Sequence, residues 1–344
     1  MNTAAADRIA KAVLYEGYML YPYRPSSVKN QQRFNFGVVY PRAFSEANKG
    51  TEPWTMQAEW LVEGTSLTQL EVRVRFLQLG DRSVEQAVDG EFLPVKHLAV
   101  DEQTFYAWQE AEEREIEIPT ATLTSLLQHA IQHPLQLSGN TAQEQLVDSR
   151  GELAGRIVRT QQAIKGCIFV AALPVAENVF KISVRVENLT EIPPAEGVTR
   201  DYALVRSLVS AHVLSGVEEG LFVSLLDPPP DLKQIAVTCR NQGVFPVLVG
   251  EEGQRDTMLA SPIILYDYPQ IAPESAGDLF DGTEIDEILS LRILTMTDEE
   301  KREMRQSDQR ARQMLERTEN LPAEQFAKLH GALRSLRPVQ KETQ

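Results

Sequence analysis

The side chains best suited to zinc chemistry in this sequence are two histidines. His129 and His133 are four residues apart, the spacing at which two imidazoles on one helix face can share a metal ion. Their neighbours are Gln128 and Gln132, so neither a carboxylate nor a thiol supplies a third ligand. Because two ligands alone rarely form a zinc site, the sequence favours a structural or solvent-exposed role for both histidines.

A cluster of acids surrounds Gly282 and is suited to a harder cation. Its members are Asp278, Asp281, Glu284, Asp286 and Glu287. Carboxylate oxygens bind Ca²⁺ or Mg²⁺, but this spacing is not that of an EF-hand loop. Acids in a first helical turn also favour the helix dipole, and Thr283 with Asp286 resembles a capping box. Helix capping is therefore favoured, and Asp278, Asp281 and Glu284 are kept as metal candidates.

Other chemical motifs are weak. Ser26 and Ser27 beside Arg24 and Lys29 resemble an anion-binding turn, but no glycine-rich loop accompanies them. Cys167 lies in an apolar run, which predicts an inert core thiol. We therefore find no strong catalytic motif and expect no cofactor.

Residues 15–44 have the most unusual local composition. They hold five of the nine tyrosines and four basic residues but one acid, in a chain of formal net charge -15. Tyrosine and arginine combine apolar area with directional hydrogen bonds, which is typical of surfaces that pack against a specific partner. Pro22 and Pro25 restrict the backbone around Tyr23, which predicts an extended segment.

A second segment, residues 261–275, repeats this Tyr-x-Tyr and Tyr-Pro character, and the two segments together contain seven of the nine tyrosines. We predict that they meet in the fold and form one partner-binding surface. The predicted contact residues are Tyr21, Tyr23, Arg24, Lys29, Arg33, Tyr266, Asp267 and Tyr268. The alternative is a core that joins the two ends of the chain, in which the rings are buried.

Length and composition exclude several classes of protein. A chain of 344 residues with 42% hydrophobic and 24% charged residues is expected to form one large or two modest globular domains. A pI near 4.9 argues against nucleic-acid binding. Asp7, Arg8 and Lys11 interrupt any apolar core of a signal peptide, and no apolar run is long enough to span a membrane. We expect a cytoplasmic protein.

Hydrophobic periodicity predicts a mixed structure. Alternation with a period of two predicts half-buried strands at 34–40, 56–62, 70–76 and 182–186. Continuous apolar runs predict buried strands at 166–173 and 221–226, and Gly250 to Gly253 is typical of a hairpin turn. Helical spacing predicts helices at 3–14, 120–132 and 201–214.

The C-terminal third is predicted to be helical. Thr283 and Thr297 predict helices that begin near 284 and 298, and Pro322 is suited to the first turn of a third. The fold class is therefore α+β, an antiparallel β-sandwich-like body with a helical C-terminal arm. The body is predicted at 1–282, with room for two subdomains divided near 135–155, and the arm at 283–344.

Two strings carry a resemblance to a known family, LYEGYMLYPYRPSSVKNQQRFNFGVVYPR at 14–42 and SPIILYDYPQIAPESAGDLFDGTEIDEIL at 261–289. They resemble an uncharacterised bacterial family encoded in [NiFe]-hydrogenase gene clusters of the actinobacterial high-affinity type. The resemblance extends over nearly the whole chain. It implies a hydrogenase-linked context, but it supplies no reaction and no catalytic residues.

The sequence and this resemblance together predict a non-enzymatic accessory or assembly protein that binds a hydrogenase subunit or complex. Nickel delivery is disfavoured because the five histidines are scattered along the chain. One alternative is a divalent-metal-dependent hydrolase or small-molecule binder that uses Asp267, Asp278, Asp281 and Glu284. Carbohydrate binding by a sandwich is a third alternative, and the sequence does not indicate an oligomeric state.

Overall fold

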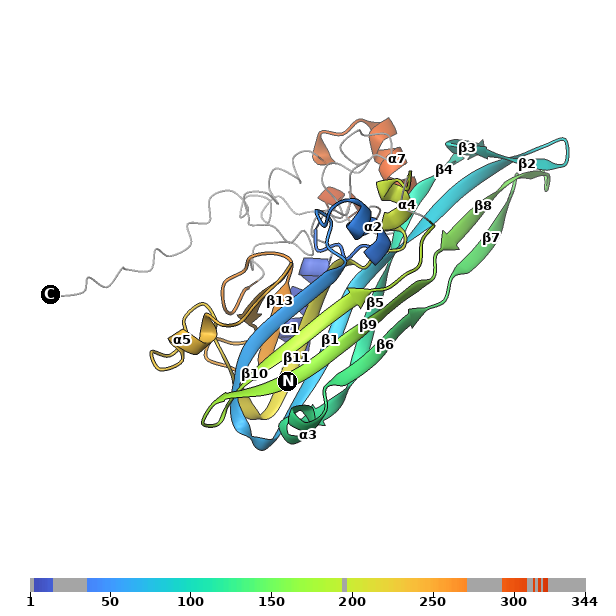
Figure 1. The fold of residues 1–344 in the computed structure, drawn as a ribbon. Coiled ribbons are helices and arrows are strands. Elements are labelled where there is room, and N and C mark those ends of the chain that lie inside the picture. The colour runs from blue at the N-terminus through green and yellow to red at the C-terminus, as the bar shows by residue number, and fades with distance from the viewer. Residues whose placement is uncertain are drawn as a thin grey trace. The chain divides into compact units, whose positions relative to one another are not determined.

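The computed structural model describes residues 3–14, 36–193, 197–270 and 293–307, together with 312, 315, 316 and 318–320 (Figure 1). The chain divides into two compact units. The first comprises Met1–Leu20 with Pro25–Gln270, and the second comprises Tyr21–Arg24 with Ile271–Gln344.

The first unit consists mainly of strands. Its helices are α1 (Thr3–Leu14), α2 (Arg42–Ala47), α3 (Leu123–Gln128), α4 (Arg200–Leu204) and α5 (Lys233–Ala236). Its strands are β1 (Thr55–Val88), β2 (Glu91–Val95), β3 (His97–Val100), β4 (Gln103–Tyr106), β5 (Trp108–Thr122), β6 (Ile131–Leu137), β7 (Asn140–Val147), β8 (Leu153–Gln161), β9 (Ile164–Ala176), β10 (Val179–Asn188), β11 (Val209–Val223), β12 (Phe245–Leu248) and β13 (Thr257–Ser261). Eleven of these strands form one sheet, while β3 and β4 pair with each other. All the pairings are antiparallel, which confirms the predicted α+β class with an antiparallel body.

Strand β1 is the spine of the sheet, because it pairs with β2, β5, β8, β10 and β11. Its pairing with β11 is interrupted between Gly64 and Gln69. At this point β1 turns back on itself, where its blue first part passes into its cyan second part in Figure 1. We call residues 64–68 the β1 corner.

The β1 corner is held by one buried hydroxyl. Thr68 is fully buried, and its Oγ1 accepts a hydrogen bond from the backbone N–H of Thr65 and donates one to the carbonyl of Glu219. A Cβ atom at Gly64 would lie 2.4 Å from Thr68 Oγ1, and one at Gly220 would lie 2.7 Å from Thr68 Cγ2. The absence of side chains at both glycines therefore leaves the space that Thr68 fills.

Because of this turn, the two parts of β1 face the same core. The inward side chains of the first part are Met56, Ala58, Trp60 and Val62, and those of the second part are Leu70, Val72, Val74 and Phe76. Trp60 also packs edge-on against Phe222 of β11, with ring centroids 6.2 Å apart. The sheet is thus sandwich-like, since two parts of one sheet enclose a single main core.

A long ribbon joins the two parts of the sheet. Strands β6 and β7 run antiparallel to β8 and β9 from Ile131 to Val147. At one end of the ribbon β9 pairs with β10, which pairs with the first part of β1. At the other end β8 pairs directly with β1 at Gly80–Gln86. Ion pairs of Arg159 with Glu110 (3.2 Å) and Glu144 (2.8 Å) connect the ribbon to β5 and fix β7 on β8.

Most of the predicted elements are confirmed, with their boundaries moved. The predicted strands 56–62 and 70–76 are the two parts of β1, and 182–186 and 166–173 lie in β10 and β9. Helix α1 coincides with the prediction at 3–14, and Gly250 to Gly253 lie in the turn between the paired strands β12 and β13. In the second unit, Thr297 and Glu300 form the predicted capping box at the start of α7 (Asp298–Ser307), through reciprocal hydrogen bonds of 2.7 and 3.2 Å.

Two predicted elements are wrong, and a third is confirmed in a shorter form. The helix predicted at 201–214 ends at Leu204, and β11 begins at Val209, because pairing with β1 on one side and β13 on the other outweighs the helical spacing. The helix predicted at 120–132 is shortened to α3, between β5 and β6. Within the described part of 34–40, the only β pairing is a bridge from Val39 to Leu208. The predicted helices near 284 and at Pro322 lie outside the described residues.

We expect that Thr68→Val destabilises the fold. Valine keeps the shape of threonine but leaves the Glu219 carbonyl and the Thr65 N–H without their buried partner, which costs about 1–3 kcal/mol of unfolding free energy. Urea unfolding followed by circular dichroism measures this difference. Thr51→Val is the matched control, because the exposed Thr51 hydroxyl bonds only to the carbonyl of Asn48. Equal stability of both variants would show that the β1 corner does not depend on this hydroxyl.

Candidate functional site

The segment Ser261–Gln270 continues from β13 and is anchored at its far end by Asp267. One carboxylate oxygen of Asp267 accepts a hydrogen bond of 2.8 Å from the backbone N–H of Leu248, and the other accepts one of 2.5 Å from the hydroxyl of Ser224. The next residue, Tyr268, donates its backbone N–H to the carbonyl of Leu248 at 2.7 Å. The segment is therefore fixed to the end of β12 and to the loop after β11.

Tyr268 is half-buried and packs inward in this region. Its side chain contacts the main core, and its backbone adopts a positive φ of 57°. Burial raises the pKa of its hydroxyl, while a hydrogen bond with the backbone of Gly253 opposes that rise. Tyr268 thus fixes the segment to the hairpin turn between β12 and β13.

Between these anchors the side chains alternate. Ile263 and Leu265 pack against the cluster formed by α1, β11, β12 and β13. Ile264 and Tyr266 point the other way, with 75% and 87% of their surface exposed. An extended segment held at both ends therefore presents two large side chains to solvent, and we call this pair the exposed pair.

The structure separates the predicted contact residues into different roles. Tyr266 is exposed as a partner surface requires, whereas Tyr268 packs on the core and Asp267 bonds within the chain. The other predicted contacts, Tyr21, Tyr23, Arg24, Lys29 and Arg33, lie outside the described residues. So do Ser26, Ser27 and the metal candidates Asp278, Asp281 and Glu284. A common surface formed by the two tyrosine segments stays a prediction.

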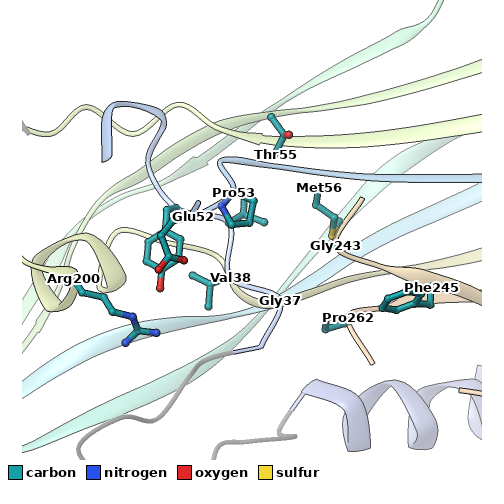
Figure 2. A pocket seen from close by; sticks show the side chains of 12 residues that line it. Gly37, Val38, Glu52, Pro53, Thr55, Met56, Arg200, Gly243, Phe245 and Pro262 are labelled. Carbon is teal, nitrogen blue, oxygen red and sulfur yellow. The ribbon is translucent and has the colours of Figure 1, made fainter. Parts of the chain in front are cut away.

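A pocket of about 320 Å³ opens beside the start of this segment, at Pro262 (Figure 2). Its walls come from residues 37–40, 52–56 and 243–245. Backbone hydrogen bonds fix these walls, since Tyr40 donates to the carbonyl of Pro53 at 2.8 Å and Val39 exchanges two bonds with Leu208. A Cβ atom at Gly37 would lie 2.6 Å from Pro262 Cγ, so glycine is needed for this close approach.

The pocket has a polar and an apolar end. In Figure 2, Arg200 and Glu52 lie toward one side, and Met56, Phe245 and Pro262 lie toward the other. The Arg200 guanidinium lies 6.0 Å from the ring centroid of Tyr40 and hydrogen-bonds to its hydroxyl. Burial raises the pKa of the Tyr40 hydroxyl, an effect that Arg200 opposes. The phenol is therefore neutral at physiological pH.

The pocket is the feature that the sequence analysis missed. Glu52, Arg200 and Phe245 are far apart in the chain and belong to no motif. The sequence indicates only local features of the pocket. One of them is the cap of α4, since the side chain of Thr199 caps this helix and so places Arg200 at the first position of α4. No sequence pattern indicates that these segments meet.

The described part of the chain does not support a metal site or a reactive thiol. No group of three or more histidine, cysteine, aspartate or glutamate residues there is placed to hold a metal ion. His129 directly follows the end of α3 and His133 lies in β6, so the two histidines do not share a helix face. Cys167 is buried as predicted, and burial raises the pKa of Cys239 to about 11, so its thiol is protonated at neutral pH.

Comparison with known proteins gives no family assignment. No protein-family model matches the chain, and no curated protein matches it. No helix within the described ranges is long and apolar enough to cross a membrane. Function must therefore be argued from the geometry of the residues themselves.

One buried titratable group lies apart from this region, His212 on β11. Its side chain is fully buried, and its Nδ1 lies 2.9 Å from the carbonyl of Ser210, to which it donates. Burial, together with the positive charge of Arg75 opposite it on β1, lowers the His212 pKa to about 4. Arg75 in turn forms ion pairs with Asp7 of α1 and Glu115 of β5.

We expect Asp267 and Tyr266 to differ in their effect on stability. Asp267→Ala leaves the buried N–H of Leu248 without its acceptor and lowers the unfolding free energy by about 1–3 kcal/mol. Tyr266→Ala removes an exposed ring and changes the unfolding free energy by less than about 0.5 kcal/mol. Denaturant unfolding of the two single variants measures both. A larger loss for Tyr266→Ala would place this ring in the folded interior.

His212 makes stability depend on pH. Between pH 6.5 and about 4 the unfolded chain takes up a proton at His212 that the folded chain does not, so unfolding becomes easier as pH falls. The loss amounts to about 3 kcal/mol at most. His212→Asn should flatten the fall in unfolding free energy over this window, measured by urea titration at several pH values. Parallel curves for wild type and variant would contradict the low pKa.

Proposed function

We propose that this protein is a non-enzymatic binding protein that docks onto a protein partner through the exposed pair, Ile264 and Tyr266. The observation that supports this most is their exposure on a segment whose ends are held by Asp267 and β13. An isoleucine and a tyrosine side by side supply apolar area with a polar tip, which is typical of interface anchors. Because the backbone is already ordered, docking loses little conformational entropy.

Further exposed apolar side chains extend this surface. Phe245 is opposite Ser261 in the β12–β13 pairing and is 44% exposed. Phe36 is 43% exposed and adjoins Gly37, which lies against Pro262. Two further stretches of the first unit, at Phe36 and at Phe245, therefore lie beside the start of the segment. Such a group is suited to the centre of an interface more than to a surface in contact with water alone.

The proposed partner is a [NiFe]-hydrogenase subunit or complex, bound in the cytoplasm during assembly. This choice is supported by the resemblance of the strings at 14–42 and 261–289 to a family encoded in hydrogenase gene clusters. The second string contains the exposed pair. An acidic chain of net charge -15 is suited to a protein partner and not to a nucleic acid.

An enzyme that used Asp267 is less well supported. Both of its carboxylate oxygens accept hydrogen bonds from the protein, which gives this residue a structural role. The remaining acids of that alternative lie outside the described residues.

The proposal is tested by Ile264→Ala combined with Tyr266→Ala. Loss of two interface anchors is expected to reduce recovery of hydrogenase subunits with the tagged protein by about tenfold or more. Co-purification from hydrogenase-expressing cells, with quantitative mass spectrometry, measures the recovery, and thermal unfolding checks the fold.

The matched control is Leu173→Ala with Val237→Ala, which removes two apolar side chains that are 55% and 79% exposed elsewhere on the first unit. This variant should retain wild-type recovery. Recovery of hydrogenase subunits by the Ile264 and Tyr266 variant at the wild-type level would overturn the proposed surface, and their absence from the wild-type sample would overturn the proposed partner.

A further inference from the structure

Four of the five edge strands of the large sheet contain a proline. Among the described residues, the strands of this sheet that pair with a single neighbour are β2, β5, β6, β7 and β12. The prolines are Pro94 in β2, Pro119 in β5, Pro134 in β6 and Pro246 in β12. Because proline has no N–H to donate to a further strand, it protects a sheet edge from pairing with another chain. Strand β7 has no proline and so lacks this protection.

Strand β7 also lacks the other features that protect an edge. Strands β2 and β12 have only five and four residues, and β5 carries five glutamates, whereas β7 has eight residues and a single charged one, Glu144. This carboxylate is paired within the chain, 2.8 Å from Arg159 of β8. The register of β7 on β8 is regular up to a shift between Leu146 and Val147. Most of β7 is therefore a regular edge without an unpaired charge.

The edge of β7 is both ordered and accessible. Leu146 is buried in a cluster with Val84 of β1 and Ile157 of β8, which holds the strand in place. Every other residue of β7 is exposed. Since β1 pairs with one side of β8 and β7 with the other, β7 forms the outer margin of the ribbon (Figure 1). Its outward backbone groups are thus positioned to pair with an added strand.

A second copy of this chain offers one edge strand that fits β7. Prolines interrupt pairing at β2, β5, β6 and β12, so the strand best suited to pair with β7 along its length is β7 of another copy. Its asparagine, threonine and glutamine side chains each carry hydrogen-bond donors and acceptors, so they can bond to one another across the pair. Antiparallel pairing of β7 with β7 has two-fold symmetry and leaves no edge of β7 for a third copy.

The charge of Glu144 selects the register of such a pair. A pairing centred on Glu144 would place the carboxylates of the two copies opposite each other, which is unfavourable. A pairing centred on Gln143 instead places Glu144 opposite Ala142 of the other copy and still overlaps nearly the full strand. The register centred on Gln143 is therefore favoured.

We propose that two copies of this chain associate through antiparallel pairing of β7 with β7, centred on Gln143. The pairing joins the two ribbons into one continuous sheet. It uses none of the residues of the exposed pair, so it goes beyond the proposed partner binding and does not depend on it. One pair of strands buries less surface than a standard interface of about 1,600 Å², so we expect a dissociation constant in the micromolar range.

Sedimentation velocity of the full chain at about 1–500 µM measures the association. Thr141→Lys with Gln145→Lys tests the edge, because in the proposed register each of these positions lies opposite the other one in the second copy. Two pairs of opposed lysines should raise the dissociation constant about fivefold or more. The matched control is Gln132→Lys with Gln136→Lys, which makes the same change in charge at the same spacing on exposed positions of β6, and it should retain the wild-type constant.

A charge exchange tests the register itself. Thr141→Lys with Gln145→Glu leaves the net charge at -15 and places a lysine opposite a glutamate twice across the pair. This variant should associate at least as tightly as the wild type. Thermal unfolding verifies that each variant is folded.

Three results would overturn the proposal. A wild-type chain that stays monomeric at every concentration would exclude pairing of two copies and leave the edge of β7 to a strand of another protein. Equal dissociation constants for the lysine variants of β7 and β6 would exclude β7 as the interface, and association of the charge-exchange variant as weak as that of the double lysine variant would exclude the register. The test of the exposed pair is unaffected, because it changes different residues and measures recovery of another protein.

Discussion

The structure depends on the turn of β1 at the β1 corner, which directs both parts of one strand toward a single core. Burial of the Thr68 hydroxyl is favourable there because it bonds to the backbone on both strands that turn, β1 and β11. Trp60 from one part and Phe76 from the other can then be removed from water together. Without the turn, the inward faces of both parts would lack a surface to pack against.

This arrangement also positions the candidate site. The second part of β1 pairs with β11, β11 with β13, and β13 with the edge strand β12, so the exposed segment starts one strand in from the edge of a continuous hydrogen-bonded sheet. Asp267 then bonds to Leu248 of β12, which ties the segment back to that edge. The exposure of Tyr266 is therefore a consequence of ordered structure around it, and this order is what the proposed docking surface requires.

Sequence periodicity predicted the strands around Trp60 and Val74, because a period of two records which side chains face the core. It did not predict the β1 corner, since Thr68 finds its partner at Glu219, far along the chain. The helix predicted at 201–214 was wrong because apolar residues buried on both faces of a strand fit helical spacing equally well.

The candidate site was predictable only in part. Composition marked the tyrosine segment at 261–275. The exposed Tyr266 and the packed Tyr268 are distinguished only by the alternation of side chains along the segment and by the hydrogen bonds of Asp267. The pocket around Glu52 was not predictable, because it is assembled by pairings between distant segments.

The central claim is that the ring at position 266 contacts a hydrogenase protein. Site-specific photo-crosslinking tests it most directly, with a photoreactive phenylalanine analogue in place of Tyr266 and, as the control, in place of Leu173 on β9, which is also exposed. In hydrogenase-expressing cells, irradiation should link position 266 to a hydrogenase subunit and position 173 to no such subunit. Crosslinks from position 266 that remain within the chain, or that match those from position 173, would contradict the account.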